Sequence, residues 1–163
     1  MSVAKNTPIS LNEVEQRLVK TTAKQRYDNC RAAGKPKCFI GYTDGYHCDI
    51  IGMGGELAFC KLFNVYPDLS TETPEFDTGD CVLDGLRIDV KTTDRPEGHL
   101  LATKWKKVSS CDAYALMTGV FPNYHFRGFM DADELLREIR LRDFGRNTLS
   151  YAASQDELKE TII

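Results

Sequence analysis

The sequence lacks a long apolar run, a secretory leader and closely spaced cysteine pairs. No stretch of its 163 residues approaches the roughly 20 apolar residues that span a bilayer, and its N-terminus has no basic start followed by an apolar segment. We therefore expect a cytoplasmic protein with no membrane partner. The absence of a C-x-x-C pair disfavours a structural zinc site and indicates reduced, mostly buried thiols. The cysteines are Cys30, Cys38, Cys48, Cys60, Cys81 and Cys111.

An excess of basic charge is also absent. The chain has 21 Lys and Arg against 24 Asp and Glu, and its formal net charge of −3 excludes a polybasic protein that coats nucleic acid. The charges are nevertheless segregated along the chain. Residues 1–40 carry eight basic and three acidic side chains, residues 66–90 carry one and seven, and residues 91–130 carry six and three. Any nucleic acid must therefore contact local basic segments on either side of an acidic centre.

The residues that are present suffice for one hydrophobic core. With 42% hydrophobic residues, the chain favours a single domain over 1–163. Ser10 and Glu13 have the spacing of a capping box and predict an N-terminal helix over about 11–33. The stretch 39–55 is predicted to be irregular. A second helix is expected to begin near Gly54 and to end before Tyr66.

The C-terminal half predicts strands at residues 112–120 and 124–129, separated by a turn at Pro122. Asp131 is expected to cap a helix that contains Leu135, Leu136 and Ile139. Residues from about 145 to 163 are polar and are expected to form a partly mobile tail. The two histidines at positions 99 and 125 are isolated from other metal-ligand residues, which favours structural roles for them.

Residues 80–92 carry the strongest hairpin signal in the chain. The dipeptide Asp84-Gly85 favours a two-residue type I′ turn, because both central positions need positive φ. This turn pairs Cys81 with Ile88 and places residue 80 opposite residue 89. Strand alternation then makes one face of the hairpin apolar and the other largely polar. The apolar face comprises Cys81, Leu83, Leu86, Ile88 and Val90, and the other face comprises Asp80, Val82, Arg87, Asp89 and Lys91.

The carboxylates of Asp80 and Asp89 are expected to lie close together, since directly opposed strand residues have Cβ atoms about 4.5–5.5 Å apart. Two like charges there are destabilising unless a cation lies between them, and Mg²⁺ prefers carboxylate oxygens. Lys91 shares the face of Asp89 and would lie beside that metal. The alternative is that Asp80 only begins the strand and that Asp89 pairs with Arg87 or Lys91.

The order Asp80, then Asp89-Val90-Lys91 across a short hairpin, resembles the active-site signature of the PD-(D/E)XK nuclease superfamily. Glu56, in the preceding helix, matches the additional acidic residue that is often found there. The resemblance covers about half of the chain, from position 52 to about 135, and extends to small phage-encoded members. Gly79 stands where the signature has proline. Asp84 is an alternative first ligand, but the hairpin register places it in the turn.

The resemblance implies an α/β fold with a restriction-endonuclease-like core, in which helices flank a central mixed β-sheet, over about residues 52–140. It implies a Mg²⁺-dependent DNA nuclease, an endonuclease rather than an exonuclease, in which Mn²⁺ can replace Mg²⁺. A phage-encoded member would act in the host cytoplasm. Many related nucleases pair to cut both strands, so a homodimer is expected alongside DNA.

The same resemblance implies roles for the site residues. Asp80, Asp89 and the main-chain carbonyl of Val90 would bind the metal, which polarises the scissile phosphate and lowers the pKa of a bound water. Glu56 would act through water or on a second ion. Lys91 would orient the attacking water and stabilise the charge that develops on the phosphate.

Basic and aromatic side chains outside this set are the candidates for DNA contacts. The lysines around Trp105 come first, and Trp105 itself would either stack on a base or pack in the core. A basic stripe along the first helix, which includes Arg31, comes next, with solvated side chains as the alternative. Thr92 and Thr93 would bond a phosphate or serve only as strand residues. The candidates are Arg17, Lys20, Lys24, Thr92, Lys104, Trp105, Lys106 and Lys107.

Two other functions stay open on the residues alone. The first is a DNA- or protein-binding module that uses a nuclease-like scaffold without cutting, which the overall acidity favours. The second is a structural protein whose acidic centre contacts a basic partner. A divalent cation would separate these functions, because a protein with a metal site gains thermal stability when its ligand binds.

Overall fold

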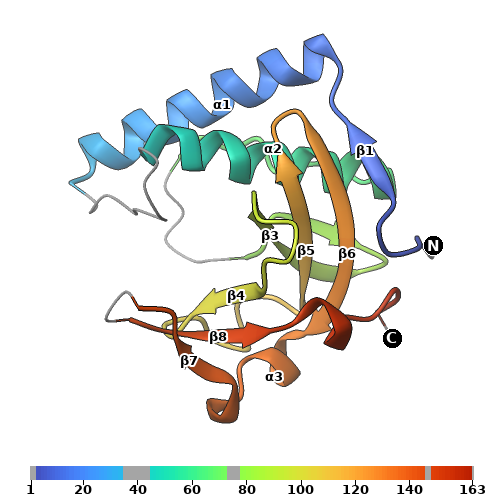
Figure 1. Ribbon diagram of the computed structural model, residues 1–163. Helices are drawn as coiled ribbons and strands as arrows, with labels where there is room; N and C mark the ends of the chain where they lie inside the picture. The colour runs from blue at the N-terminus through green and yellow to red at the C-terminus, as the bar shows by residue number, and fades with distance from the viewer. Residues whose placement is uncertain (1–2, 35–44, 73–77, 146–147, 163) are drawn as a thin grey trace.

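The computed structural model describes residues 3–34, 45–72, 78–145 and 148–162 (Figure 1). Two long helices, α1 (Glu13–Ala32) and α2 (Gly45–Phe63), lie side by side against a curled five-stranded sheet of order β1-β6-β5-β3-β2. A second sheet has the order β4-β8-β7. The strands are β1 (Pro8–Ser10), β2 (Cys81–Leu83), β3 (Leu86–Thr93), β4 (Leu100–Thr103), β5 (Ala113–Val120), β6 (Asn123–Asp131), β7 (Leu141–Asp143) and β8 (Leu149–Ala153). The short helical turns are α3 (Ala132–Leu135), η1 (Glu138–Arg140) and η2 (Gln155–Glu157).

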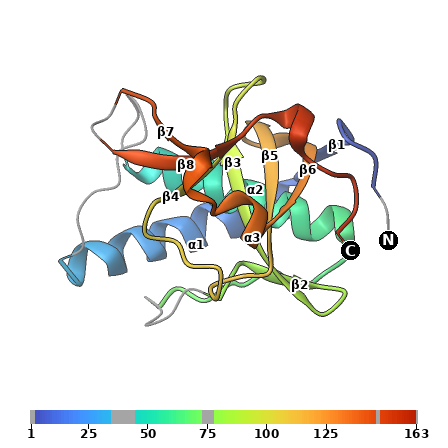
Figure 2. The same ribbon diagram turned by 90° about the horizontal axis from the view of Figure 1, so that it is seen from below.

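The central sheet is mixed and is covered on both faces. β3 runs parallel to β5, whereas β5 is antiparallel to β6. Along β5, Ala113, Ala115 and Met117 pack toward α1 and α2, and Tyr114 and Leu116 pack into a second buried cluster with β4, β8 and α3. Figure 2 shows this arrangement from the side of the small sheet, with the two long helices behind the strands. The expected α/β architecture, with helices flanking a central mixed sheet, is therefore confirmed.

The N-terminal helix begins two residues later than expected and is capped by a different residue. The Asn12 side chain accepts a hydrogen bond from the Glu15 amide (3.0 Å), and the Glu15 carboxylate accepts one from the Asn12 amide (2.7 Å). This is a reciprocal capping box. Ser10 instead belongs to β1, where it pairs with Asn123 of β6. The helix ends at Ala32, close to the expected boundary.

The second helix is longer than expected. It begins at Gly45, so residues 45–53 are helical and not irregular, whereas 39–44 lie outside the described residues. Glycine lowers intrinsic helix propensity, which is why this stretch does not read as a helix. Tertiary packing requires the glycines: a Cβ on Gly54 would lie 2.1 Å from Tyr124 Oη, and one on Gly55 would lie 2.0 Å from Thr92 Oγ1.

The hairpin between β2 and β3 has the expected turn and register. Asp84 and Gly85 have φ of 50° and 83°, and Cys81 pairs with Ile88. On the apolar face, Cys81, Leu83, Ile88 and Val90 are buried and Leu86 packs against the same core. The described ladder ends at the Cys81–Ile88 pair, and the Asp80 amide donates to the Ile88 carbonyl, so residue 80 is not paired with residue 89 as expected.

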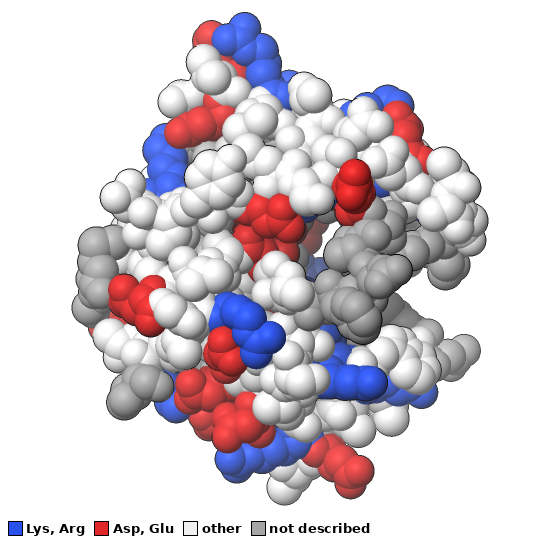
Figure 3. Space-filling view, turned by 180° about the vertical axis from the view of Figure 1, so that it is seen from behind, with Lys and Arg blue, Asp and Glu red and all other residues white. Residues whose placement is uncertain are grey.

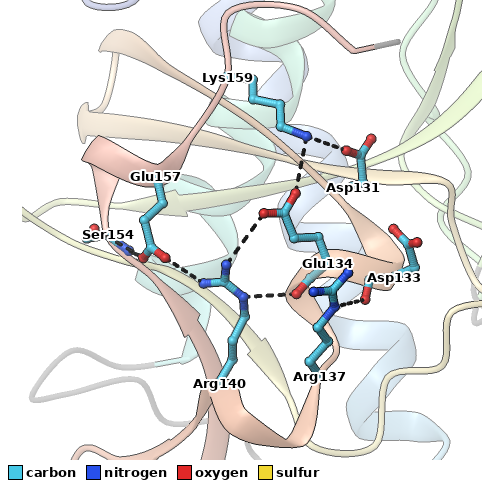
Figure 4. A network of polar contacts seen from close by, with 8 residues as sticks. All are labelled: Asp131, Asp133, Glu134, Arg137, Arg140, Ser154, Glu157 and Lys159. Atoms are coloured by element: carbon cyan, nitrogen blue, oxygen red, sulfur yellow. Dashed lines mark hydrogen bonds and ion pairs between the residues drawn. The ribbon is translucent and has the colours of Figure 1, made fainter.

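The described part of the C-terminal segment, residues 148–162, packs against the rest of the fold. Residues 149–153 form β8, which pairs with both β4 and β7, and Ala153 and Leu158 are buried. Ion pairs hold this segment to the end of β6 and to the helical turns that follow it (Figure 4). The helix expected after Asp131 has only four residues, Asp131 makes no side-chain capping bond, and Ile139 is 79% exposed. Within the described residues, no helix is long and apolar enough to cross a membrane, and Cys30, Cys48, Cys60, Cys81 and Cys111 are free thiols.

Candidate functional site

The candidate site lies at the edge of β3, beyond the point where β2 ends. Asp89 and Lys91 project from β3 to the face opposite Ile88 and Val90, because their β5 partners, Tyr114 and Leu116, belong to the buried cluster on that side. Glu56 approaches from α2, and Asp80 from the residue before β2. Gly55 packs directly against Thr92 of β3, and this contact places the following residue, Glu56, beside the edge of the strand.

Asp80 is held by its backbone and its side chain. Its amide donates to the Ile88 carbonyl (2.7 Å), one residue short of Asp89, an offset typical of a β-bulge. One carboxylate oxygen accepts a hydrogen bond from the Val90 amide at 2.7 Å. Gly79, just before it, has φ of +80°, and a Cβ there would lie 2.8 Å from the Ile88 oxygen. Proline cannot adopt positive φ, so glycine at this position is a structural requirement.

Electrostatics show that the three carboxylates influence one another. Burial raises the pKa of Asp80 well above its usual range, and the charges of Glu56 and Asp89 raise it further, against the opposite effects of Lys91 and the Val90 amide. Burial also raises the pKa of Glu56, although the Arg26 guanidinium acts to lower it. The structure therefore brings together Glu56, Asp80, Asp89 and Lys91, the four residues to which the resemblance assigns roles in catalysis.

Asp89 is buried, with 2% of its surface exposed, and is paired with two lysines. Lys91 Nζ contacts Oδ1, and Lys106 Nζ lies 2.6 Å from Oδ2. The pairing with Lys91 matches one alternative drawn from the sequence. Arg87 does not pair with Asp89: its guanidinium binds Asp112, with Nη2 2.9 Å from Oδ1.

Glu56 is paired with Arg26 of α1. The Arg26 Nη1 lies 3.0 Å from Oε2, and the same guanidinium donates to the carbonyls of Asp68 and Ser70. The site thus contains three carboxylates and three cationic side chains. Its oxygen donors are chemically suited to a hard divalent cation. Among the described residues, no three His, Cys, Asp or Glu side chains form a ready group of metal ligands.

The basic loop after β4 divides into inward and outward side chains. Lys104, Trp105 and Lys107 are exposed, whereas Lys106 turns inward to Asp89. Trp105 is 69% exposed, and the Lys104 Nζ lies 4.2 Å from the centre of its ring. Trp105 therefore does not pack in the core, and it remains a candidate for contact with a ligand near the site.

The basic stripe on α1 faces away from Glu56. Lys24 and Arg26 are separated by about 160° around the helix axis, and Arg26 is the residue that reaches the site. Along the stripe, Lys24 pairs with Asp28 at 2.6 Å, Lys20 lies near the Phe121 ring, and the Arg31 guanidinium stacks on Tyr27. Arg17 is exposed on the same side.

The hydroxyl of Thr92 is buried against α2 at the Gly55 contact, so its position favours a packing role over a phosphate contact. On the face drawn in Figure 3, acidic and basic side chains are interspersed in small groups. Within the described part of that face, no broad basic field is visible. Any DNA contact on that face would therefore depend on a few side chains.

Sequence reasoning missed Arg26, and it named Lys106 only as a candidate for DNA contact, not as a partner of Asp89. Arg26 continues the buried spacing of Val19, Thr22 and Ala23 on α1, and a charged residue on an apolar helical stripe is a usable signal of a buried partner. For Lys106 no comparable signal exists, because its neighbours Lys104 and Lys107 have the same local composition. Only the path of the chain after β4 distinguishes it.

The comparison with protein-family models matches residues 7–160 to the family described as "Family of unknown function (DUF5843)". Neither the comparison with curated proteins nor that with solved structures found a match.

Proposed function

This chain belongs to a family of unknown function, DUF5843, and from the residues gathered at the edge of β3 we propose that it is a Mg²⁺-dependent DNA endonuclease of the PD-(D/E)XK type. The observation that carries the proposal is the convergence of Glu56 from α2, Asp80 from the residue before β2, and Asp89 and Lys91 from β3. Carboxylates that repel one another in a buried site are stabilised by a divalent cation.

The fold supports the proposal through the hairpin and the strand that follows it. β2 and β3 form the antiparallel pair that presents Asp80 and Asp89, and β5 returns parallel to β3. α2 covers this sheet and supplies Glu56. This arrangement supports the proposal of a restriction-endonuclease-like core.

The proposed chemistry assigns each residue a task. Asp80, Asp89 and the Val90 carbonyl would hold Mg²⁺, and Glu56 would contact it through water. A divalent cation at this place supplies Lewis acidity toward the phosphate and lowers the pKa of a bound water. Lys91 is 31% exposed at its side chain, so its ammonium can donate to a phosphate oxygen or orient a water molecule. Two chains acting as a homodimer would cut both strands of a duplex.

A cleavage assay with supercoiled plasmid and labelled duplex tests the proposal. With Mg²⁺ or Mn²⁺ the wild-type protein is expected to cut, and EDTA should abolish the activity. Asp89→Asn and Lys91→Ala should each lower the rate by about 10²-fold or more, since each removes a group that acts on the transition state. Asp84→Asn, in the exposed turn of the same hairpin, is the matched control and should cut at the wild-type rate. Cleavage that persists in both site variants would overturn the assignment.

A DNA-binding module that does not cut is the second candidate, because the site is already neutralised by its own cations. Arg26, Lys91 and Lys106 together balance the three carboxylates. This candidate predicts DNA retention in EDTA, equal retention by Asp80→Ala, and no product on prolonged incubation with metal. The proposed nuclease predicts the opposite for the last two measurements.

A further inference from the structure

Lys106 reaches the candidate site from outside the hairpin. It lies 17 positions after Asp89 in the chain, in the turn that follows β4, where its amide donates to the Thr103 carbonyl at 3.0 Å. Its side chain is only 18% exposed, and its Nζ lies 2.6 Å from Asp89 Oδ2. The adjacent Trp105 and Lys107 are exposed, so the inward direction of Lys106 is a property of this one side chain.

The Lys106 ammonium occupies a position at the Asp89 carboxylate that a bound metal ion would need. Lys91 contacts Oδ1 of Asp89 and Lys106 contacts Oδ2, so both oxygens already have a cationic partner. A carboxylate oxygen has a second lone pair, but an ammonium and a divalent cation on one oxygen would repel each other at contact distance. Binding of Mg²⁺ to Asp89 therefore favours departure of one ammonium. Lys106 is the one that a loop carries, whereas Lys91 is fixed in the middle of β3.

We propose that Lys106 is an internal counter-ion of the metal site, which neutralises Asp89 without metal and moves to an anionic group of the substrate when a divalent cation binds. The inference rests on the proposed nuclease function and specifies how its site is regulated. The direction of the movement follows from the surroundings, since Lys104 and Lys107 already place positive charge on the exposed side of the same turn. Lys106 would thus be a substrate-binding residue in the loaded state.

The chain contains its own reporter for this movement. Its single tryptophan, Trp105, is the residue next to Lys106 and lies largely in solvent with Lys104 over its ring. We expect displacement of the Lys106 side chain to change the surroundings of this indole. Tryptophan emission should therefore change when metal is added without DNA, and it should saturate at the same metal concentration as the binding heat.

The test uses the full chain and the metal alone. Titrations of Mg²⁺ and Mn²⁺ are followed by calorimetry and by Trp105 emission in wild type, Lys106→Met and Lys106→Gln. Removing the competing ammonium should tighten metal binding by about tenfold, which corresponds to about 1.4 kcal/mol, and should abolish the emission change. Two variants with different side chains guard against a folding defect in either one. The matched control is Lys159→Met, which also removes a lysine paired with an aspartate, here Asp131 at 2.8 Å. This variant should bind metal like wild type.

DNA binding in the presence of metal supplies the second readout. Loss of one phosphate contact in Lys106→Met should weaken duplex binding and lower the slope of log K against log salt by about one. Tighter metal binding together with weaker DNA binding in Lys106→Met supports the counter-ion proposal. Equal metal affinity in wild type and both Lys106 variants overturns it, while leaving the nuclease proposal intact if wild type cuts. Absence of metal binding and of cleavage in all variants overturns the proposed function as well.

Discussion

Asp89 shows how a charged side chain is tolerated in an almost fully buried position. An isolated buried carboxylate is strongly disfavoured, and pairing with hydrogen-bonded cations offsets much of this cost. Lys91 and Lys106 provide that pairing here, one on each oxygen. At the scale of single residues, the site is thus a balance of charges, and the removal of one partner leaves another charge uncompensated.

A second carboxylate, Asp112, carries a clear pH dependence. Its oxygens accept hydrogen bonds from the Arg87 amide (2.8 Å) and guanidinium (3.1 and 2.9 Å), which hold its pKa at about 2, below the usual 3.8. Since the folded-state pKa is lowered, ionised Asp112 stabilises the fold at neutral pH, and this contribution is lost as pH falls toward 2. Asp112→Asn should therefore melt a few degrees lower than wild type near neutral pH.

The pH series checks the cause of that difference. Melting curves of wild type and Asp112→Asn should stay a constant distance apart above the usual carboxyl pKa and converge below it. Asp133→Asn, at an exposed carboxylate of α3, is the control and should follow wild type throughout. A difference that persists unchanged in strong acid would show that Asp112 acts through shape and not through its charge.

At the scale of elements, the approach of α2 to the sheet decides where Glu56 lies. Glycines 54 and 55 allow the helix backbone to touch the side chains of Tyr124 and Thr92. The same glycines weaken the helix itself, so its stability comes from burial between α1 and the sheet. The length of α2 therefore depends on its packing against α1 and the sheet.

Two glycine substitutions on α2 are expected to have opposite effects. Gly55→Ala would place a Cβ 2.0 Å from Thr92 Oγ1 and should destabilise the fold by about 1–3 kcal/mol through overpacking. Gly52→Ala meets nothing within 4 Å and should stabilise by about 0.5–1 kcal/mol, because alanine favours a helix. Urea unfolding measures both. Gly55→Ala should also lower cleavage, since it displaces Glu56, and a stability equal to wild type would contradict the close contact.

At the scale of the whole molecule, the C-terminal segment closes the second face of the central sheet. Arg140 lies between Glu134 and Glu157, and Lys159 lies between Asp131 and Glu134 (Figure 4). The bridge between Phe129 and Lys159 continues the contact to β6. This network joins residues near the end of the chain to the turn that follows β6, so both cover the cluster containing Leu135 and Leu158.

Arg140→Met should weaken this closure without changing the site. The pairs are partly exposed, and such pairs contribute up to about 1 kcal/mol each. We expect the variant to melt about 2–4 °C lower per kcal/mol lost. The difference should shrink in 1 M salt, where the Debye length is about 3 Å. Metal binding at low temperature should equal wild type, and a loss of metal affinity would show that the two regions are coupled.

The sequence by itself determined the hairpin of β2 and β3, because its turn depends on two positive φ values and its register on strict side-chain alternation over a few residues. It also indicated Asp80, Asp89 and Lys91 as neighbours for the same local reason. Only the tertiary structure decided the hydrogen bonding of Asp80, the early start of α2, the strand β8, and the presence of Arg26 and Lys106 beside the carboxylates. These features depend on contacts between distant segments, where burial and charge pairing override local propensity.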